Sequence, residues 1–272
     1  VHPEREAEWY KKETKNMSKR QIAQELGCNF NTSGETVIDP ECMEWMLAGL
    51  KEPKYRTGFD RNFWLWEEFD PTCNYLMVSD VSRGDGADFS TFHIIKLETL
   101  EVIGEYQGKP TLDMFANMLN SVGREFGSCM LVVENNNIGY SVLDKLLTEY
   151  QYPNVYHSIK STHEYIEQYQ AETRTSAVPG FTTSMKTRPL IVAKLEEFIR
   201  NKLITIYSSR TINEMKTFIW RNGKPQAMKG YNDDLIMALA IACWVRDTAL
   251  QANARELNYQ KASLIPFKLS MH

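Results

Sequence analysis

The feature that most constrains the fold is a short apolar run that ends in a carboxylate. Residues 75–79 read Tyr-Leu-Met-Val-Ser, and Asp80 follows them directly. A run of this length and composition predicts a buried strand with Asp80 at its far end. Because burying a lone carboxylate is costly, Asp80 is expected to have a partner there.

The residues after Asp80 predict an antiparallel meander. Gly84 and Gly86 allow the chain to reverse tightly. Residues 91–97 then read as a second strand and residues 101–106 as a third. Asp80 is therefore expected inside this meander.

Two later elements have the same design. The apolar residues 129–133 lead to Glu134, and Asp233 and Asp234 precede residues 235–242, whose composition is helical. Carboxylates at the mouths of separate buried elements supply the rigidly held oxygen ligands that a divalent metal needs, with positions left for water and phosphate. The sequence thus predicts a divalent-metal site.

Each of these carboxylates also has a structural explanation. Asp80 fits a strand-end turn, and Glu134 fits a cap on the helix that follows it. Of Asp233 and Asp234, one is suited to cap the helix and the other to interact with the helix dipole. Two adjacent carboxylates repel each other, however, and a metal relieves that repulsion more directly than a cap does. The sequence leaves open which of the two is the ligand.

Two further aspartates, Asp85 and Asp88, lie in the reversal after the first strand, where aspartate is common. Asp88 is close enough to Asp80 along the chain for a hairpin to fold it back as a fourth ligand or as a support for the ligands. Asp85 is the weaker candidate of the two.

The composition is that of a globular chain, with 43% apolar and 24% charged residues. Its 272 residues suffice for one full core and an appendage. No apolar run approaches the roughly 20 residues that span a bilayer. The five cysteines form no CxxC pair, which argues for reduced thiols and against a structural zinc site. There is no Walker-type phosphate loop, and no Ser-His-Asp pattern or metal-type histidine spacing.

A basic segment lies between residues 186 and 229, although the net charge is −4. Lys186, Arg188 and Lys194 are its candidates for contact with phosphates. A basic surface beside an acidic site suits a protein that holds a nucleic-acid backbone and cuts it at metals. A helix with a solvated charged face is the alternative.

The remaining pattern predicts an α/β domain with a mixed sheet flanked by helices. Residues 1–70 read as a helical linker or tail of a preceding domain, residues 71–250 as the main domain and residues 251–272 as a peripheral tail. The start at Val1 and the weak core pattern before residue 70 lead us to expect a fragment of a longer protein. The other expected elements are helices over 111–126, 138–150 and 189–200, strands over 154–157 and 203–207, a flap over 161–180 and a hairpin at residues 222–223.

Three motifs together resemble the nuclease domain of tailed-bacteriophage terminase large subunits. They are Val78-Ser79-Asp80 with Asp88-Phe89-Ser90, Val132-Val133-Glu134-Asn135, and Tyr231-Asn232-Asp233-Asp234-Leu235. Residues 187–189 and 24–30 also look like that family. The resemblance implies an RNase H-like (RuvC-like) fold and an endonuclease that cuts double-stranded DNA during viral genome packaging. Because contacts with phosphates position DNA without reading its bases, little sequence specificity is expected.

The resemblance further implies that Asp80, Glu134 and one or both of Asp233 and Asp234 are catalytic and bind two Mg²⁺ or Mn²⁺ ions. It implies as partners an ATPase domain of the same polypeptide, a portal protein and a small terminase subunit. The expected place of action is the cytoplasm of an infected bacterium, without a membrane partner and outside the mature virion.

Other classes remain as alternatives. Residues 80–90 loosely resemble the phosphate-binding hairpin of an actin-like ATPase, but the sequence lacks the second glycine-rich phosphate loop that such an enzyme needs. A module that only binds DNA or a portal protein is disfavoured by the intact carboxylates. A RuvC-like resolvase or a transposase also fits. One departure from the terminase pattern is Asn232, where many relatives have His.

Overall fold

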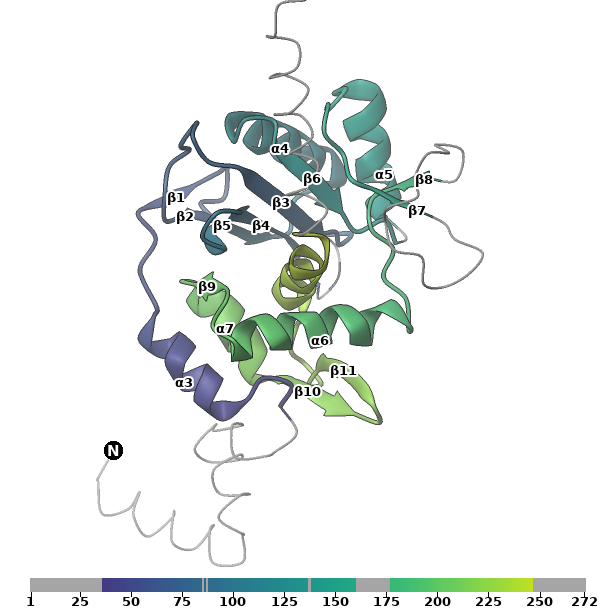
Figure 1. Cartoon of the computed structure of the whole chain (residues 1–272). Coiled ribbons are helices and arrows are strands. Elements are labelled where there is room, and N and C mark those ends of the chain that lie inside the picture. The colour runs from purple at the N-terminus through teal and green to yellow at the C-terminus, as the bar shows by residue number, and fades with distance from the viewer. Residues whose placement is uncertain (1–35, 85, 87, 137, 160–176, 247–272) are drawn as a thin grey trace, which may run out of the picture.

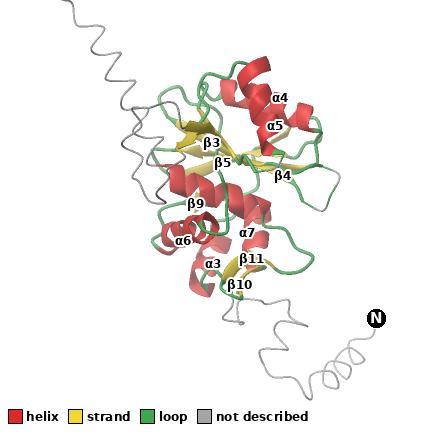
Figure 2. Ribbon diagram, turned by 90° about the vertical axis from the view of Figure 1, so that its right-hand side faces the viewer, coloured by secondary structure: helices red, strands yellow, loops and turns green. Residues whose placement is uncertain are grey.

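The computed structural model describes residues 36–84, 86, 88–136, 138–159 and 177–246, and Figure 1 shows their arrangement. A mixed sheet lies between two layers of helices, as the side view in Figure 2 also shows. In the described part of the chain, no helix has the length and apolar character that crossing a membrane requires.

The sheet has seven strands, with β9 joined to β5 beside the path β1-β2-β5-β4-β3-β6. Their bounds are β1 Tyr55–Thr57, β2 Phe63–Leu65, β3 Tyr75–Asp80, β4 Ser90–Lys96, β5 Glu101–Gly108, β6 Met130–Val133 and β9 Thr205–Ile206. Strands β3, β4 and β5 form an antiparallel meander, whereas β6 pairs with β3 in parallel. The predicted meander and mixed sheet are confirmed.

The central strands are buried on both faces. The first five residues of β3 and all four residues of β6 are buried. An uninterrupted apolar run is typical of a strand covered on both sides, whereas a half-exposed strand alternates. The apolar runs before Asp80 and Glu134 therefore form buried strands, and each carboxylate lies at the end of its run.

One face of the sheet is covered by α4 Leu112–Glu125, α5 Gly139–Asp144 and a π-helical turn over Lys145–Glu149. Helix α4 begins after Thr111, whose hydroxyl accepts a hydrogen bond from the Met114 N–H at 3.3 Å. Phe115 and Leu119 from this helix pack with Met77 of β3 in one apolar cluster. The helix expected over residues 138–150 is thus present, with its last part widened into the π turn.

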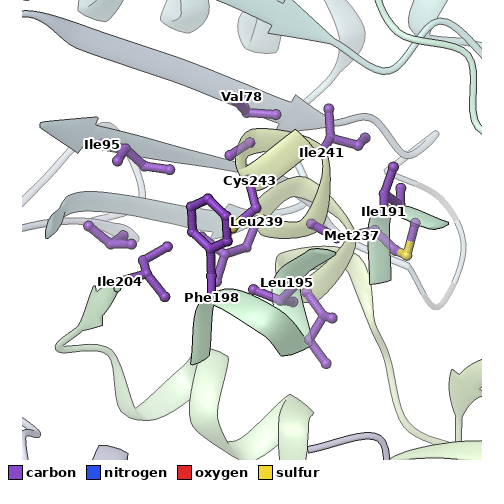
Figure 3. Close-up of a cluster of buried hydrophobic side chains, with 14 of the residues drawn as sticks. Val78, Ile95, Ile191, Leu195, Phe198, Ile204, Met237, Leu239, Ile241 and Cys243 are labelled. Carbon is purple, nitrogen blue, oxygen red and sulfur yellow. The ribbon is translucent and has the colours of Figure 1, made fainter. Parts of the chain in front are cut away.

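The other face is covered by α3 Pro40–Ala48, α6 Thr187–Arg200, α7 Ser209–Lys216 and a helix over residues 234–246. The last of these lies between the sheet and α6 (Figure 3). Ile241 of this helix belongs to one buried cluster with Val78 and Ile95 of the sheet and with Leu195 and Phe198 of α6. This packing sets the helix that begins at Asp234 directly against β3.

A hairpin and a second antiparallel pair of strands complete the described structure. Strands β10 Phe218–Arg221 and β11 Lys224–Ala227 are joined by Asn222 and Gly223, whose φ angles of 52° and 72° match the left-handed turn that asparagine and glycine favour. Strand β7 His157–Ile159 pairs with β8 Ala177–Pro179. The expected hairpin is confirmed, the strand expected over 154–157 lies further along the chain, and most of the expected flap lies outside the described residues.

Residues 36–70 differ from the linker that the sequence predicts. Strand β2 pairs with β5, and Val37 and Met43 are buried in the core. Strand pairing and burial thus join these residues to the main domain. The prediction fails here because β1 and β2 are only three residues long, which is too short for a strand period to be recognised in the sequence. Residues 1–35 and the expected tail over 251–272 lie outside the described residues.

Candidate functional site

Asp80 and Glu134 lie side by side at one edge of the sheet. Asp80 ends β3, and Glu134 follows β6, which runs parallel to β3 with Val133 opposite Ser79. The Glu134 N–H donates to the Ser79 carbonyl oxygen at 3.0 Å, so the ladder continues one residue past β6. Since the carboxyl ends of parallel strands meet at the same edge, the two acidic side chains become neighbours.

The electrostatics of Asp80 reflect this crowding. Burial, the charge of Glu134 and a hydrogen bond between the two carboxyl groups raise the pKa of Asp80 well above its usual value. The charge of Asp234 and, less strongly, that of Asp233 act in the same direction. Asp80 therefore lies among carboxylates whose charges disfavour its own ionised form.

Glu134 is held by the chain that follows it. The Asn136 side-chain amide donates to Glu134 Oε1 at 3.0 Å and to the Thr183 carbonyl oxygen at 2.6 Å. Helix α5 starts so close that a Cβ atom on Gly139 would lie 1.8 Å from the Glu134 carbonyl oxygen. The N-cap of α5 is Ile138, so a helix cap does not account for Glu134.

Asp234 is oriented by the loop that leaves β3. Its Oδ2 atom accepts hydrogen bonds from the Phe89 N–H at 2.8 Å and from the Asn232 side-chain amide at 3.1 Å. Burial is the main cause that raises the pKa of Asp234 to about 6, and Asp88 and Asp233 add to it against these two hydrogen bonds. Asp88 itself is exposed, and Asp85 lies outside the described residues.

Asp233 faces different partners. Its Oδ2 atom accepts a hydrogen bond from the Arg188 guanidinium of α6 and another from the Ala227 N–H of β11 at 3.0 Å. Arg188 also donates through Nε to the Pro225 carbonyl oxygen at 3.0 Å. Asp233 thus ties the start of the helix over residues 234–246 to α6 and to the β10–β11 hairpin.

The carboxylates of Glu134, Asp234 and Asp233 are near enough to Asp80 for their charges to raise its pKa. Carboxylate oxygens are the ligands that a hard divalent cation prefers. Among the residues that the structure describes, no three acidic, histidine or cysteine side chains stand together as a ready-made metal cluster.

No family model matches the chain. Comparison with solved structures finds the large terminase nuclease from thermophilic phage G20c with bound magnesium, at 15% identity and a TM-score of 0.57, over 77% of this chain and 96% of that one. The cobalt-bound form of the same nuclease matches with the same values. The large terminase nuclease domain of Thermus phage P74-26 matches at 14% identity and a TM-score of 0.54, over 74% of this chain and 93% of that one.

The chain has the fold of a large terminase nuclease domain. The fold that the sequence motifs imply, an RNase H-like mixed sheet with helices on both sides, is confirmed.

The basic residues expected to contact phosphates have different surroundings within this terminase-type fold. Lys186 is exposed at the N-cap of α6. Arg188 is engaged with Asp233, and Lys194 forms an ion pair with Glu197 at 3.1 Å. Of the three, Lys186 is therefore exposed, whereas Arg188 and Lys194 are partly buried.

Arg210, another member of the basic segment, points into the terminase-type domain. Its Nε atom donates to Glu105 Oε1 at 2.8 Å, and its guanidinium lies 3.7 Å from the centre of the Trp64 ring. Glu105 is completely buried and also accepts a hydrogen bond from Ser208 at 2.6 Å. The excess of basic residues between 186 and 229 is thus partly structural.

Residues outside the expected set also hold the site. The Thr91 hydroxyl donates to the Asp234 carbonyl oxygen at 3.1 Å, and His93 Nε2 lies 2.9 Å from the Leu235 carbonyl oxygen. Glu214 of α7 accepts hydrogen bonds from the Leu235 and Ile236 N–H groups. Nothing in the local sequence singles out these residues, because their partners are far away along the chain.

Proposed function

We propose that this chain is a metal-dependent endonuclease that hydrolyses phosphodiester bonds in double-stranded DNA during viral genome packaging. The observation that carries the proposal is the pairing of Asp80 and Glu134 at one edge of the sheet, with the charge of Asp234 acting on Asp80. The fold shared with the phage nucleases supports it, and one of these, the phage G20c nuclease, is described both with bound magnesium and with bound cobalt.

Asp80, Glu134 and Asp234 would hold the ions, for which we infer a pair of Mg²⁺ or Mn²⁺. Such ions, when bound, would lower the pKa of a water so that it loses a proton near neutral pH and becomes a better nucleophile, and they would stabilise the charge on the leaving oxygen. The rigid strand ends fix Asp80 and Glu134, and the Phe89 N–H and Asn232 orient Asp234. Asp88 would support the site through its charge on Asp234.

Asp234 is favoured over Asp233 as the ligand. The charge of Asp234 acts more strongly on Asp80 than that of Asp233 does. Asp233 already neutralises Arg188 and accepts the Ala227 N–H. A carboxylate with a cationic partner gains less from a metal, because its charge is already compensated. We therefore assign Asp233 to the support of the site.

DNA would be held through its phosphates, and contacts of that kind position the duplex without reading its bases. Lys186 is best placed for such a contact, because it is exposed at the start of the helix that carries Arg188. Arg188 and Lys194 would act mainly through the position of α6. Cleavage should therefore depend little on sequence and strongly on salt.

The packaging role implies further partners. These are an ATPase domain of the same polypeptide, a portal protein and a small terminase subunit, met in the cytoplasm of an infected bacterium. Resemblance to terminases is the basis for all of them.

The proposal can be tested by incubating supercoiled plasmid with the chain and Mg²⁺, Mn²⁺, Ca²⁺ or EDTA. The Asp80→Asn variant removes one charge from the site. Asp113→Asn is the matched control, since Asp113 lies on α4 with its side chain 74% exposed. Nicking and linearisation in Mg²⁺ or Mn²⁺, absent in EDTA and in Asp80→Asn but retained in Asp113→Asn, are expected. Equal cleavage by all three proteins in EDTA would refute the metal-dependent mechanism, and no cleavage by any of them would favour a module that only binds.

A further inference from the structure

The helix over residues 234–246 begins in an unusual way. The Met237 N–H donates to the Asp233 carbonyl oxygen at 2.8 Å, which makes Asp233 the N-cap residue of the helix. An aspartate at this position normally uses its side chain to accept the N–H groups of the first turn. The Asp233 side chain instead points to Arg188 and Ala227. The first turn therefore needs another acceptor.

Glu214 supplies that acceptor from a different helix. Its Oε2 atom accepts hydrogen bonds from the Leu235 N–H at 3.0 Å and the Ile236 N–H at 3.3 Å. These are the two N–H groups that an N-cap side chain usually satisfies. Its Oε1 atom accepts a hydrogen bond from the Gln107 side chain on β5 at 2.8 Å.

This arrangement is energetically demanding. Glu214 is only 8% exposed. Burial and then the charge of Asp234 raise the pKa of Glu214 to about 8, against the stabilising N–H donors. A serine or asparagine at the N-cap would satisfy the same N–H groups locally, without a second buried carboxylate near Asp234. Capping by Glu214 therefore costs more free energy than capping by a local N-cap side chain would.

Capping by Glu214 fixes the directions of two adjacent side chains, those of Asp233 and Asp234. Because Glu214 accepts the hydrogen bonds of the first-turn N–H groups, the Asp233 side chain is not needed for them and binds Arg188 instead. The Thr91 hydroxyl and His93, both on β4, bond to the Asp234 and Leu235 carbonyl oxygens from the sheet side. The first turn is thus held between α7 and the strand next to Asp80, so neither its rotation nor its height above the sheet is free.

We propose that Glu214 is a positioning residue, which caps the helix over residues 234–246 from α7 and so keeps Asp234 turned toward Asp80 and Asp233 turned toward Arg188. This inference rests on the proposed function of the acidic site. Glu214 acts through the backbone of the helix that carries the acidic side chains, because it accepts hydrogen bonds from the Leu235 and Ile236 N–H groups.

The test compares Glu214→Ala, which removes the acceptor, with Glu214→Gln, whose side-chain oxygen can still accept both N–H groups. Phe115→Leu is the stability control, because Phe115 is buried on the opposite face of the sheet. The readouts are Mn²⁺ affinity by titration calorimetry, hydrogen exchange of the Leu235 and Ile236 amides, and kcat and KM for plasmid cleavage.

Glu214→Ala should weaken Mn²⁺ binding about 10–100-fold, the range typical for residues that orient metal ligands. It should also speed exchange of the two amides and lower kcat with little change in KM. Glu214→Gln should stay within about threefold of the wild type in Mn²⁺ affinity, and Phe115→Leu should lose stability without these effects.

Two outcomes would overturn the inference, and they are distinguishable from failure of the proposed function. If the wild type binds Mn²⁺ and cuts DNA but Glu214→Ala behaves like Phe115→Leu, Glu214 is only structural. If Glu214→Gln is as impaired as Glu214→Ala, hydrogen-bond acceptance is not its role. If the wild type neither binds Mn²⁺ nor cuts DNA, the proposed function itself fails and the inference falls with it.

Discussion

Arg188 and Asp233 form an ion pair that joins α6 to the start of the helix over residues 234–246. The side chains are 28% and 19% exposed, so the pair is largely shielded from water. Asp234, the next residue, bonds instead to the Phe89 N–H and to Asn232. Two adjacent aspartates therefore have different surroundings, and this division predicts different effects of mutation.

Asp234→Asn should lower the rate of DNA cleavage by more than the roughly 10–100-fold that loss of a supporting residue costs, because Asp234 is the proposed metal ligand. Asp233→Asn should retain measurable cleavage. It should also lower the free energy of unfolding by about 1–3 kcal/mol, since Arg188 loses its charged partner. Plasmid cleavage and chemical denaturation of both variants give the comparison. Greater loss of activity in Asp233→Asn would reverse the assignment of the ligand.

Asp80→Asn should stabilise the protein when divalent metals are removed. Asp80 is crowded by Glu134 and Asp234, and replacing its carboxyl with a neutral amide relieves that repulsion. The melting temperature in EDTA should rise by about 2–4 °C for each kcal/mol relieved. Thermal unfolding followed by circular dichroism measures the change, with Asp113→Asn as the control. A lower melting temperature for Asp80→Asn than for the control would mean that the carboxyl is better satisfied than its neighbours indicate.

Adding Mn²⁺ should make the wild type more stable than Asp80→Asn, which is the reverse of the order expected in EDTA. A ligand that binds only the folded state stabilises it, and the wild type has the full set of carboxylates. The melting temperature of the wild type should therefore rise with Mn²⁺ concentration, while that of Asp80→Asn should rise much less. Equal shifts in the two proteins would place the Mn²⁺ site elsewhere.

Local patterns in the sequence were sufficient to predict the strands that end at Asp80 and Glu134. Each apolar run is contiguous, and its burial on both faces follows from its composition. The β10–β11 hairpin is predictable for the same reason, because Asn222 and Gly223 determine its turn. In contrast, β1 is only three residues long and all three are exposed, so no apolar period marks it.

The partners of the acidic residues were not predictable in this way. Arg188 is 45 residues from Asp233, and Glu214 is 21 residues from Leu235. Such pairs depend on how α6 and α7 pack against the sheet, which no local pattern encodes. The sequence could name Asp233 and Asp234 as a pair, but only the packing distinguishes their roles.

Gly139→Ala should disturb Glu134 specifically. The added Cβ would lie 1.8 Å from the Glu134 carbonyl oxygen, and a backbone atom cannot move aside as a flexible side chain can. The variant should lose about 1–3 kcal/mol of stability, as overpacked sites do, together with Mn²⁺ affinity. Gly86→Ala is the matched control, because nothing lies within 4 Å of its Cβ position. Unchanged Mn²⁺ affinity in Gly139→Ala would show that α5 and Glu134 can shift apart without affecting the site.

The stability of the protein should fall as the pH rises from about 5 to 8, and Glu214 should cause part of that fall. The carboxyl of Glu214 has a pKa of about 8 in the folded state and 4.5 as its ordinary value. Between these values the folded state holds a proton that the unfolded state has released, so the free energy of unfolding decreases with rising pH. Each pKa unit corresponds to about 1.4 kcal/mol. Glu214→Gln cannot titrate, and its stability relative to the wild type should therefore increase across this window.

Urea denaturation in EDTA at pH 5.5, 7.0 and 8.5 measures that difference. The Glu197→Gln variant is the control, since Glu197 pairs with Lys194 near the surface and its side chain is 43% exposed. A constant difference between Glu214→Gln and the wild type at all three pH values would mean that Glu214 is ionised throughout. In that case its three hydrogen-bond donors, Gln107 and the Leu235 and Ile236 N–H groups, outweigh both its burial and the charge of Asp234.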